Sequence, residues 1–324
     1  MSGVTSISPR VYVAGHTGLA GSAISRALKR RGYANVVGEP HARLDLTLPQ
    51  QVERYFDETR PDVVILAAAL VGGIIANSER PADFIRNNLQ IQTNVIDAAY
   101  RFGARKLIFL GSSCIYPKLA PQPLREEYLL SGPLEPTNDA YAIAKLAGIK
   151  MCQAYRRQYG FDAVSVLPTN LYGPNDNFDP RASHVIPGLI RRMDDARTRG
   201  DASFGVWGSG RPRREFLHAD DFADAIVTVL ENYSGEEPIN IGAGEDLTIA
   251  ELAQIVRRAV GFERPIEFDA SKPDGTPRKL LETSPIRALG WAPKIGLEQG
   301  IAETVGAFRE SGFARFDQRR SANS

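Results

Sequence analysis

Short apolar segments without polar alternation recur along the first half of the chain, with amphipathic segments between them. Val11–Ala14, Val63–Ala67, Lys106–Leu110 and Ala163–Leu167 are apolar at nearly every position, and Asn35–Val37 is a shorter example. Strands of this kind are buried on both faces, as in a parallel sheet covered by helices on both sides. Because parallel strands need right-handed crossovers, the pattern predicts an α/β fold with a doubly wound, Rossmann-like sheet.

The intervening segments have helical periodicity, and the texture of the chain changes after about Thr169. In the first half we expect helices at Leu19–Arg31, Pro49–Arg60, Pro81–Arg101 and Asp139–Tyr159. Later, Pro and Gly become frequent, and we expect strands at Phe204–Val206 and Pro238–Ile241 and helices at Ser183–Arg197, Asp220–Asn232 and Ile249–Val260. We therefore divide the chain into a first domain, residues 1–169 with some later return segments, and a smaller C-terminal α/β lobe, residues 170–324.

Composition and charge exclude several classes of protein. The 324 residues are 43% hydrophobic and 24% charged, which is typical of a globular chain and not of a disordered one. The 39 Lys and Arg residues are balanced by 38 Asp and Glu residues, so we expect neither a nucleic-acid partner nor a membrane surface. Cys114 and Cys152 are too few for a disulfide framework or a cysteine metal site, so we expect no metal and a reducing compartment.

The chain has no segment typical of secretion or of a membrane span. Met1–Arg10 lacks the apolar core of a signal peptide. The longest apolar run, Val63–Ala76, has 14 residues, fewer than the roughly 20 that a transmembrane helix needs. We expect a cytoplasmic protein.

A glycine triad follows the first strand and opens the first helix. Gly15, Gly18 and Gly21 stand in the order Gly-x2-Gly-x2-Gly. Gly15 suits the sharp turn, Gly18 lets the backbone approach a pyrophosphate, and Gly21 lets the helix pack closely, while the helix N-terminus offers amide groups to phosphates. This context predicts a dinucleotide site, although a phosphate-free glycine turn is the structural alternative.

Acidic residues near the end of the second strand bear on the choice of dinucleotide. Glu39 could accept hydrogen bonds from a ribose diol and would repel a 2′-phosphate, or it could be a solvated loop carboxylate. Arg43 and His41 lie close enough in the sequence to favour NADP instead. Both readings stay open on these residues alone.

A tyrosine, a lysine and a serine form a second candidate site. Tyr141 and Lys145 are four residues apart and therefore share a helix face. An ammonium beside a phenol favours the phenolate, and so we expect the pKa of Tyr141 to be lowered from about 10. Ser112 follows a buried strand, at the edge where open α/β sheets bind ligands, and could hydrogen-bond a substrate carbonyl.

With the glycine turn, these three residues resemble the Ser-Tyr-Lys triad of the extended short-chain dehydrogenase/reductase superfamily. Further motifs are similar to those of the GDP-L-fucose synthases, which are GDP-4-keto-6-deoxy-D-mannose 3,5-epimerase-4-reductases. These motifs are Gly111–Lys118, Leu134–Thr137, Pro168–Pro174, Ser183–Pro187 and Lys272–Lys279. The resemblance runs from about Val11 to Pro293 and implies epimerisation at C3 and C5 of the keto-sugar, followed by reduction at C4.

The resemblance assigns roles that elementary chemistry supports. Inverting a carbon next to a ketone needs one group to remove a proton and another to return one from the opposite face. The resemblance implies that Cys114 is the base and His184 the acid, and both have suitable ordinary pKa values. Without the motifs, Cys114 would be taken for a small buried hydrophobe and His184 for a residue at a helix start.

The resemblance also implies the binding residues, the cofactor and the oligomer. The cofactor residues are Gly15, His16, Thr17, Gly18, Leu19, Ala20, Gly21, Glu39, Asp45, Leu110, Gly111, Ser112, Ser113, Tyr141, Lys145, Pro168, Thr169, Asn170, Leu171 and His184. The substrate residues are Asn170, Arg192, Trp207, Arg214, Asp274 and Arg278. The implied cofactor is NADP, with NAD tolerated because Thr17 and Glu39 stand where NADPH-preferring members carry arginines. The implied oligomer is a homodimer through a four-helix bundle.

Three rival functions can be weighed from the same residues. A 4,6-dehydratase needs an acidic pair beside the serine, where this chain has Ser113 and Cys114. A 4-epimerase has no use for a Cys–His pair. A redox-sensing binding protein without chemistry could lose Tyr141 and Lys145, yet both are present with Ser112.

Overall fold

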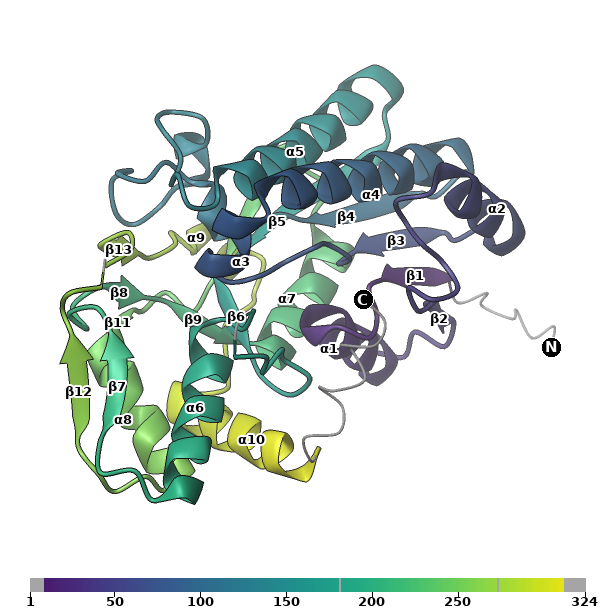
Figure 1. Ribbon diagram of the computed structural model, residues 1–324. Coiled ribbons are helices and arrows are strands. Elements are labelled where there is room, and N and C mark those ends of the chain that lie inside the picture. Colours follow the sequence, from purple (N-terminus) through teal and green to yellow (C-terminus); the bar gives the residue numbers. More distant parts are fainter. Residues whose placement is uncertain (1–8, 181, 273, 312–324) are drawn as a thin grey trace.

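The centre of the molecule is a six-stranded, wholly parallel sheet (Figure 1). The computed structural model describes residues 9–180, 182–272 and 274–311. In spatial order the strands are β10 (Ile239–Ile241), β5 (Asp162–Pro168), β4 (Lys106–Leu110), β3 (Val63–Leu66), β1 (Val11–Ala14) and β2 (Val36–Val37). The predicted doubly wound parallel sheet is therefore confirmed.

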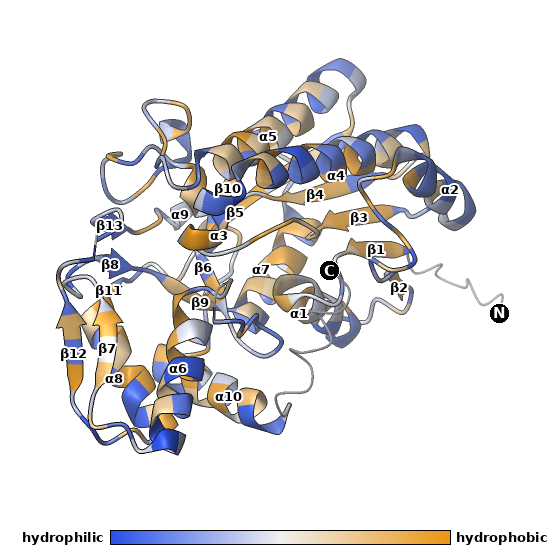
Figure 2. Ribbon diagram, viewed as in Figure 1, coloured by the Kyte–Doolittle hydropathy of each residue, from blue (hydrophilic) through white to orange (hydrophobic). Residues whose placement is uncertain are grey.

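Helices cover both faces of this sheet, which is why most side chains of its strands are apolar and buried (Figure 2). Successive side chains of a strand point to opposite faces. Tyr12 of β1 accordingly packs with the core under α2 (Pro49–Thr59), α4 (Pro81–Arg101) and α5 (Asp139–Tyr159). Its neighbour Val13 packs with the core under α1 (Leu19–Arg30) and α7 (Ala219–Asn232).

The smaller lobe has its own apolar core between α6 (Val185–Arg199), α8 (Ile249–Val260) and α10 (Leu297–Glu310). Its strands form short sheets. They are β6 (Asn170–Tyr172) with β9 (Phe216–His218), β7 (Phe204–Trp207) with β12 (Ile266–Asp269), and β8 (Arg213–Arg214) with β11 (Leu247–Thr248) and β13 (Arg278–Lys279). The remaining short helices are α3 (Ile74–Glu79), α9 (Ser284–Ala288) and the 3-10 turns Ser113–Ile115 and Glu126–Tyr128.

The chain returns from the smaller lobe to the larger one. β10 pairs with β5, and α7 packs along α1, where Arg26 and Asp220 form an ion pair of 2.6 Å. These are the return segments expected from the sequence, and the boundary at residues 169 and 170 stays a prediction. It falls where β5 ends and β6 begins a separate sheet.

Two local expectations from the sequence differ from the structure. The helix expected at Ser183–Arg197 is α6, which begins at Val185 and reaches Arg199 because Gly200 ends it in a left-handed conformation (φ 74°). The apolar run after β3 contains a short helix, α3, that was not predicted, since Gly72 and Gly73 obscure its periodicity. Across the described ranges, no helix is long and apolar enough to cross a membrane.

Candidate active site

The glycine turn between β1 and α1 has the geometry that a dinucleotide requires. Gly15 has a φ of 83°, and a Cβ there would lie 2.8 Å from the backbone nitrogen of Ala68. A Cβ on Gly21 would lie 2.1 Å from the carbonyl oxygen of Gly15, so α1 can pack this closely on the turn only because residue 21 is glycine. Among the described residues, no side chain caps the first turn of α1, which leaves its amide groups for phosphates.

The end of β2 lies beside this turn. The ring of His16 packs on Gly38, where a Cβ would approach it to 2.4 Å, and its buried Nδ1 has no hydrogen-bond partner within the described chain. Half-buried Glu39 follows Gly38, and exposed Thr17 follows His16. A polar ring atom without a partner and an adjacent carboxylate fit an adenosine ribose. The carboxylate of Asp45, in contrast, accepts hydrogen bonds from Thr47.

Ser112 joins the catalytic candidates at the end of β4. Its Oγ lies 3.0 Å from the sulfur of Cys114 and accepts a hydrogen bond from the Cys114 amide at 3.3 Å. A second hydrogen bond joins Ser112 to the phenol of Tyr141. The structure therefore brings Ser112, Cys114 and Tyr141 together from segments almost 30 residues apart in the sequence.

The electrostatics of Tyr141 and Lys145 differ from the expectation. Burial raises the pKa of Tyr141 and Cys114 adds to the increase, while the hydrogen bond from Ser112 opposes it. Burial also lowers the pKa of Lys145 to about 8. The expected lowering of the Tyr141 pKa by Lys145 is wrong for this structure, because burial of the phenol dominates; the ammonium of Lys145 donates to the carbonyl oxygen of Leu110 at 2.7 Å.

Buried hydrogen bonds hold the segment that carries Cys114. The hydroxyl of Tyr116 donates to the side-chain oxygen of Asn240 at 2.7 Å. The amide of Asn240 donates in turn to the carbonyl oxygen of Leu124 at 2.9 Å. Asn240 lies on β10, so the return strand fixes this segment against the sheet.

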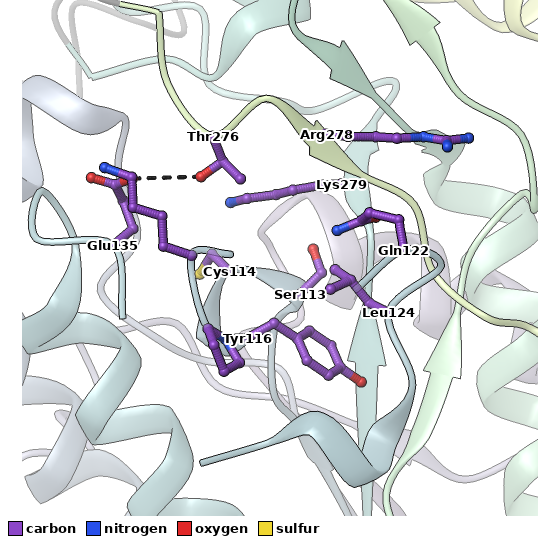
Figure 3. A pocket seen from close by; sticks show the side chains of 11 residues that line it. Ser113, Cys114, Tyr116, Gln122, Leu124, Glu135, Thr276, Arg278 and Lys279 are labelled. Atoms are coloured by element: carbon purple, nitrogen blue, oxygen red, sulfur yellow. Dashed lines mark hydrogen bonds and ion pairs between the residues drawn. The ribbon is translucent and has the colours of Figure 1, made fainter. Parts of the chain in front are cut away.

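A pocket opens beside Cys114, and it contains residues that the sequence did not single out. Lys279 of β13 points into it toward Glu135, whereas Arg278 points the other way (Figure 3). Burial lowers the pKa of Lys279, while Cys114 acts to raise it. Glu135 pairs with Lys118 at 3.1 Å in the same pocket. Lys279 and Glu135 both stand in motifs quoted above, but nothing local in the sequence indicates that they meet.

His184 is the residue immediately before α6 and is exposed. Protein around the imidazole replaces part of its water shell, which lowers its pKa. The preceding carbonyl, of Ser183, would lie 2.9 Å from a Cβ on Gly73. The Gly72–Gly73 turn also packs on Phe84, whose ring meets Tyr141 edge-on with the centroids 6.3 Å apart. The Gly72–Gly73 turn and the ring of Phe84 thus lie between the His184 segment and Tyr141, and the pairing of His184 with Cys114 stays a prediction.

The predicted substrate residues of the smaller lobe differ in burial and in their hydrogen-bond partners. Arg192 and Arg214 are half-buried, donate to backbone carbonyl oxygens, and have pKa values lowered by burial. Trp207 is 61% exposed at the end of β7. Asp274 binds the amide and hydroxyl of Ser209. Their role as substrate ligands stays a prediction.

Arg278 and the strand-end residues complete the predicted set. Arg278 pairs with Asp246, which also holds Arg213 at 2.7 Å. Arg278 and Arg213 therefore share the single negative charge of Asp246. At the ends of β4 and β5, Gly111 donates to the carbonyl oxygen of Val166 at 2.8 Å, and Asn170 donates to that of Glu215 at 2.8 Å.

A glycine turn, a Ser-Tyr-Lys cluster and a parallel sheet agree with the superfamily that the sequence resembles. The chain matches the NAD dependent epimerase/dehydratase family over residues 11–242. The chain belongs to this family. The cofactor of the chain is accordingly a nicotinamide dinucleotide, NAD or NADP. Among the described residues, no group of three or more His, Cys, Asp or Glu is placed to hold a metal ion.

Relatives within the family confirm the resemblance to GDP-L-fucose synthases. The chain is 60% identical to a probable GDP-L-fucose synthase 1 of Oryza sativa, covering 91% of this chain and 90% of the relative. It is 52% identical to the GDP-L-fucose synthase of Escherichia coli K12, covering 93% and 97%. The fold matches the crystal structure of a GDP-L-fucose synthetase from Naegleria fowleri bound to NADP, with a TM-score of 0.87, 32% identity and 94% of each chain covered.

Proposed function

We propose that this chain is a bifunctional, NADP-dependent 3,5-epimerase and 4-reductase that converts GDP-4-keto-6-deoxy-D-mannose to GDP-L-fucose. The observation that carries the proposal is the position of Ser112, whose hydroxyl meets both the sulfur of Cys114 and the phenol of Tyr141. A carbonyl held by Ser112 and Tyr141 places its neighbouring carbon atoms next to a thiol. That arrangement suits proton removal beside a ketone.

Epimerisation needs a base, an acid and a place for the negative charge. The thiolate of Cys114 takes the proton from C3, and Ser112 and Tyr141 donate hydrogen bonds to the oxygen on which the enolate charge develops. His184 then delivers a proton to the opposite face of C3. The same two groups act again at C5 once the thiol of Cys114 has lost its proton to solvent and His184 has taken one up, so that each inversion removes one proton and returns one.

Reduction uses the same two hydrogen bonds, from Ser112 and Tyr141, to the carbonyl oxygen of the sugar. A bound reduced nicotinamide supplies the hydride to C4 of the sugar. Tyr141 donates the phenolic proton to the C4 oxygen, turning the ketone into a hydroxyl. Its raised pKa keeps the phenol protonated until that step. The ammonium of Lys145, which donates to the carbonyl oxygen of Leu110, would use a remaining N–H group to hold the nicotinamide ribose.

The smaller lobe would bind the nucleotide diphosphate. Arg192 and Arg214 are partly desolvated guanidinium groups, and an anion would restore the interaction that burial removes. Trp207 offers an exposed indole face for stacking on a base or sugar. Asn170, at the junction of the lobes, could contact both ligands.

NADP is the dinucleotide that we propose, with NAD tolerated. The resemblance to relatives favours NADP, whereas neither Thr17 nor Glu39 offers a positive charge to a 2′-phosphate. We also propose that the protein is cytoplasmic and that two copies pair through α4 and α5. These helices lie side by side (Figure 1), and the hydroxyl of Tyr155 donates to Asp97 at 2.8 Å between them.

A 4-epimerase or a dehydratase of the same family is the competing function. Neither explains a thiol 3.0 Å from the catalytic serine oxygen, because neither inverts C3 and C5. The test is incubation of the purified chain with GDP-4-keto-6-deoxy-D-mannose and NADPH. We expect loss of the absorbance of reduced nicotinamide and a product identified as GDP-L-fucose by NMR. A product with the manno configuration at C3 and C5 would refute the epimerase half.

A further inference from the structure

Glu215 is a fully buried carboxylate outside the cluster described above. It lies between β8 and β9 and is 0% exposed. Its Oε1 accepts a hydrogen bond from the amide of Gly244 at 2.7 Å, and its Oε2 accepts one from the amide of Leu281 at 3.0 Å. One side chain therefore fastens two loops that are almost 40 residues apart in the sequence.

The backbone of the same residue holds a third segment. The carbonyl oxygen of Glu215 accepts hydrogen bonds from the hydroxyl of Thr169 at 3.1 Å and from the amide of Asn170 at 2.8 Å. Both residues lie where the chain passes from the larger lobe to the smaller one. Glu215 thus connects the ends of β5, β10 and β13.

This arrangement is costly. Burial raises the pKa of Glu215 to about 7, against the two amide hydrogen bonds that lower it. Gly242 has to be glycine, because a Cβ there would lie 2.3 Å from the carboxylate oxygen. Apolar side chains would join the loops at a lower cost in folding free energy, because they need no desolvation of a charge. A carboxylate kept here despite this cost indicates that the two loops have to be positioned accurately.

Leu281 ends a segment that crosses the pocket, and we call residues 276–281 the strap. At one end, Thr276 lies 3.5 Å from a carboxylate oxygen of Glu135. At the other, the amide of Leu280 donates to the side chain of Gln122 at 2.9 Å. Lys279 lies between these anchors and points into the pocket beside Cys114 (Figure 3). The register of the strap determines where that ammonium lies.

We propose that Glu215 is a positioning residue for the nucleotide-sugar site, which it serves by fixing the strap so that Lys279 lies beside Cys114. The inference rests on the proposed function. Loss of the carboxylate lets the strap shift, which moves Lys279 away from the thiol. The backbone carbonyl of Glu215 keeps its hydrogen bonds from Thr169 and Asn170 after a side-chain substitution, and only the contact of the carboxyl with the Thr169 hydroxyl is lost, so we expect the dinucleotide site to change little.

The test compares Glu215→Gln with a matched control, Asp221→Asn. Asp221 is also buried (3% exposed), and its carboxylate accepts two backbone amide bonds, from Lys294 at 3.0 Å and Ile295 at 2.8 Å, away from the pocket. In Glu215→Gln, an NH2 group replaces one carboxylate oxygen and faces the backbone N–H that this oxygen accepted from, so one of the two hydrogen bonds is lost. We expect KM for the keto-sugar to rise at least 10-fold and KM for the dinucleotide to stay within 2-fold. Asp221→Asn should lower Tm and change neither KM.

A double-mutant cycle with Lys279→Met then shows whether Glu215 acts through the strap. We expect Lys279→Met to impair the wild type strongly and the Glu215→Gln protein by less than 3-fold, because coupled residues are not additive. A normal KM for the keto-sugar in Glu215→Gln, or two fully multiplicative effects, would overturn the inference.

Folding failure is covered by a second variant. Gly242→Ala pushes a methyl group into the same carboxylate and should reproduce the rise in KM. If neither Glu215→Gln nor Gly242→Ala folds while Asp221→Asn does, Glu215 determines the fold and the inference is wrong. A wild type that does not turn over the keto-sugar refutes the proposed function itself, whereas an active wild type with an unaffected Glu215→Gln refutes only the role of Glu215.

Discussion

At the scale of single residues, one hydroxyl serves two kinds of chemistry. Ser112 contacts the thiol that would remove protons and the phenol that would deliver one. A carbonyl bound at this hydroxyl would have more acidic C–H groups beside it, which favours epimerisation, and a more electrophilic carbon, which favours hydride transfer. One pocket could therefore carry out both reactions.

Replacing Tyr141 with Phe tests the reductive step. The variant keeps the ring that packs on Phe84 but loses the proton donor. Because general acid catalysis contributes about 10²- to 10⁴-fold, we expect hydride transfer to slow at least 100-fold. Stopped-flow absorbance of reduced nicotinamide measures it, with dinucleotide affinity as the control. Unchanged hydride transfer would remove Tyr141 from the mechanism.

Replacing Lys145 with Met tests the cost of its burial. Its pKa falls from 10.5 to about 8 in the folded protein, so between these values the unfolded chain binds more protons and wild-type stability rises with pH. Below about pH 8 the full cost is present, about 3 kcal/mol at roughly 1.4 kcal/mol per pKa unit. Met carries no such cost, so the stability of Lys145→Met does not change with pH for this reason. We expect the free energy of unfolding of Lys145→Met minus that of the wild type to fall by up to about 3 kcal/mol from pH 7 to 10.5. Urea denaturation without dinucleotide measures it. Parallel pH curves would contradict the prediction.

The relative positions of the candidate residues could be predicted from the sequence where the signal was local, whereas their catalytic roles stay predictions. Tyr141 and Lys145 share one helix, and Ser112 and Cys114 share one turn, so spacing and motif were sufficient to place them together. Lys279 reaches the same pocket from more than 160 residues farther along the chain. Its position depends on the strap and on Glu215, which no local pattern encodes. The wrong expectation for the Tyr141 pKa has the same origin, since burial cannot be deduced from spacing.

At the scale of elements, the turn after β1 and the end of β2 decide which dinucleotide fits. The glycine turn supplies amide groups for the pyrophosphate, which both dinucleotides share. Thr17 within this turn and Glu39 after β2 would meet the part of the ribose where the two dinucleotides differ. A carboxylate there favours a free 2′-hydroxyl over a 2′-phosphate.

The double variant Thr17→Arg/Glu39→Arg should therefore favour NADPH more strongly than the wild type does. A hydrogen bond to a charged group contributes about 1.5–3 kcal/mol, so we expect the ratio of kcat/KM for NADPH to that for NADH to rise at least 10-fold. Glu58→Arg, an exposed charge reversal on α2, is the control and should leave the ratio unchanged. A strong preference of the wild type for NADH would overturn the proposed cofactor.

Helices and strands could be predicted from the sequence where their hydrophobic pattern runs without interruption. The strands of the central sheet and the helices α4 and α5 follow the expected ranges closely, because long periodic segments have one good conformation. The short helix α3 was missed, since two glycines precede it. Strands of two residues, such as β8 and β13, exist only because tertiary pairing creates them.

At the scale of the whole molecule, the site is assembled by chain segments that cross between lobes. Strand β10 anchors the Cys114 segment, and α7 packs on α1. The larger lobe would carry the dinucleotide and the smaller lobe the nucleotide sugar, so that the reacting atoms meet at their junction. A pairing of two copies through α4 and α5 would leave this junction open.

The proposed dimer can be tested at α5. Ile143 is 46% exposed on this helix, and a buried carboxylate in a helix bundle would be costly. We expect the wild type to sediment as a dimer and Ile143→Glu as a monomer. Leu119→Glu changes an 82% exposed apolar side chain outside both helices and should remain dimeric. A monomeric wild type would contradict the proposal.

The central claim is that Cys114 and His184 invert C3 and C5 of a bound keto-sugar. The most direct measurement is deuterium incorporation from heavy water into GDP-4-keto-6-deoxy-D-mannose, followed by NMR without reduced dinucleotide. We predict label at both C3 and C5 with the wild type, and at least a 100-fold loss of exchange in Cys114→Ser and in His184→Gln with dinucleotide affinity intact. Absence of exchange in the wild type, or undiminished exchange in Cys114→Ser, would contradict the account.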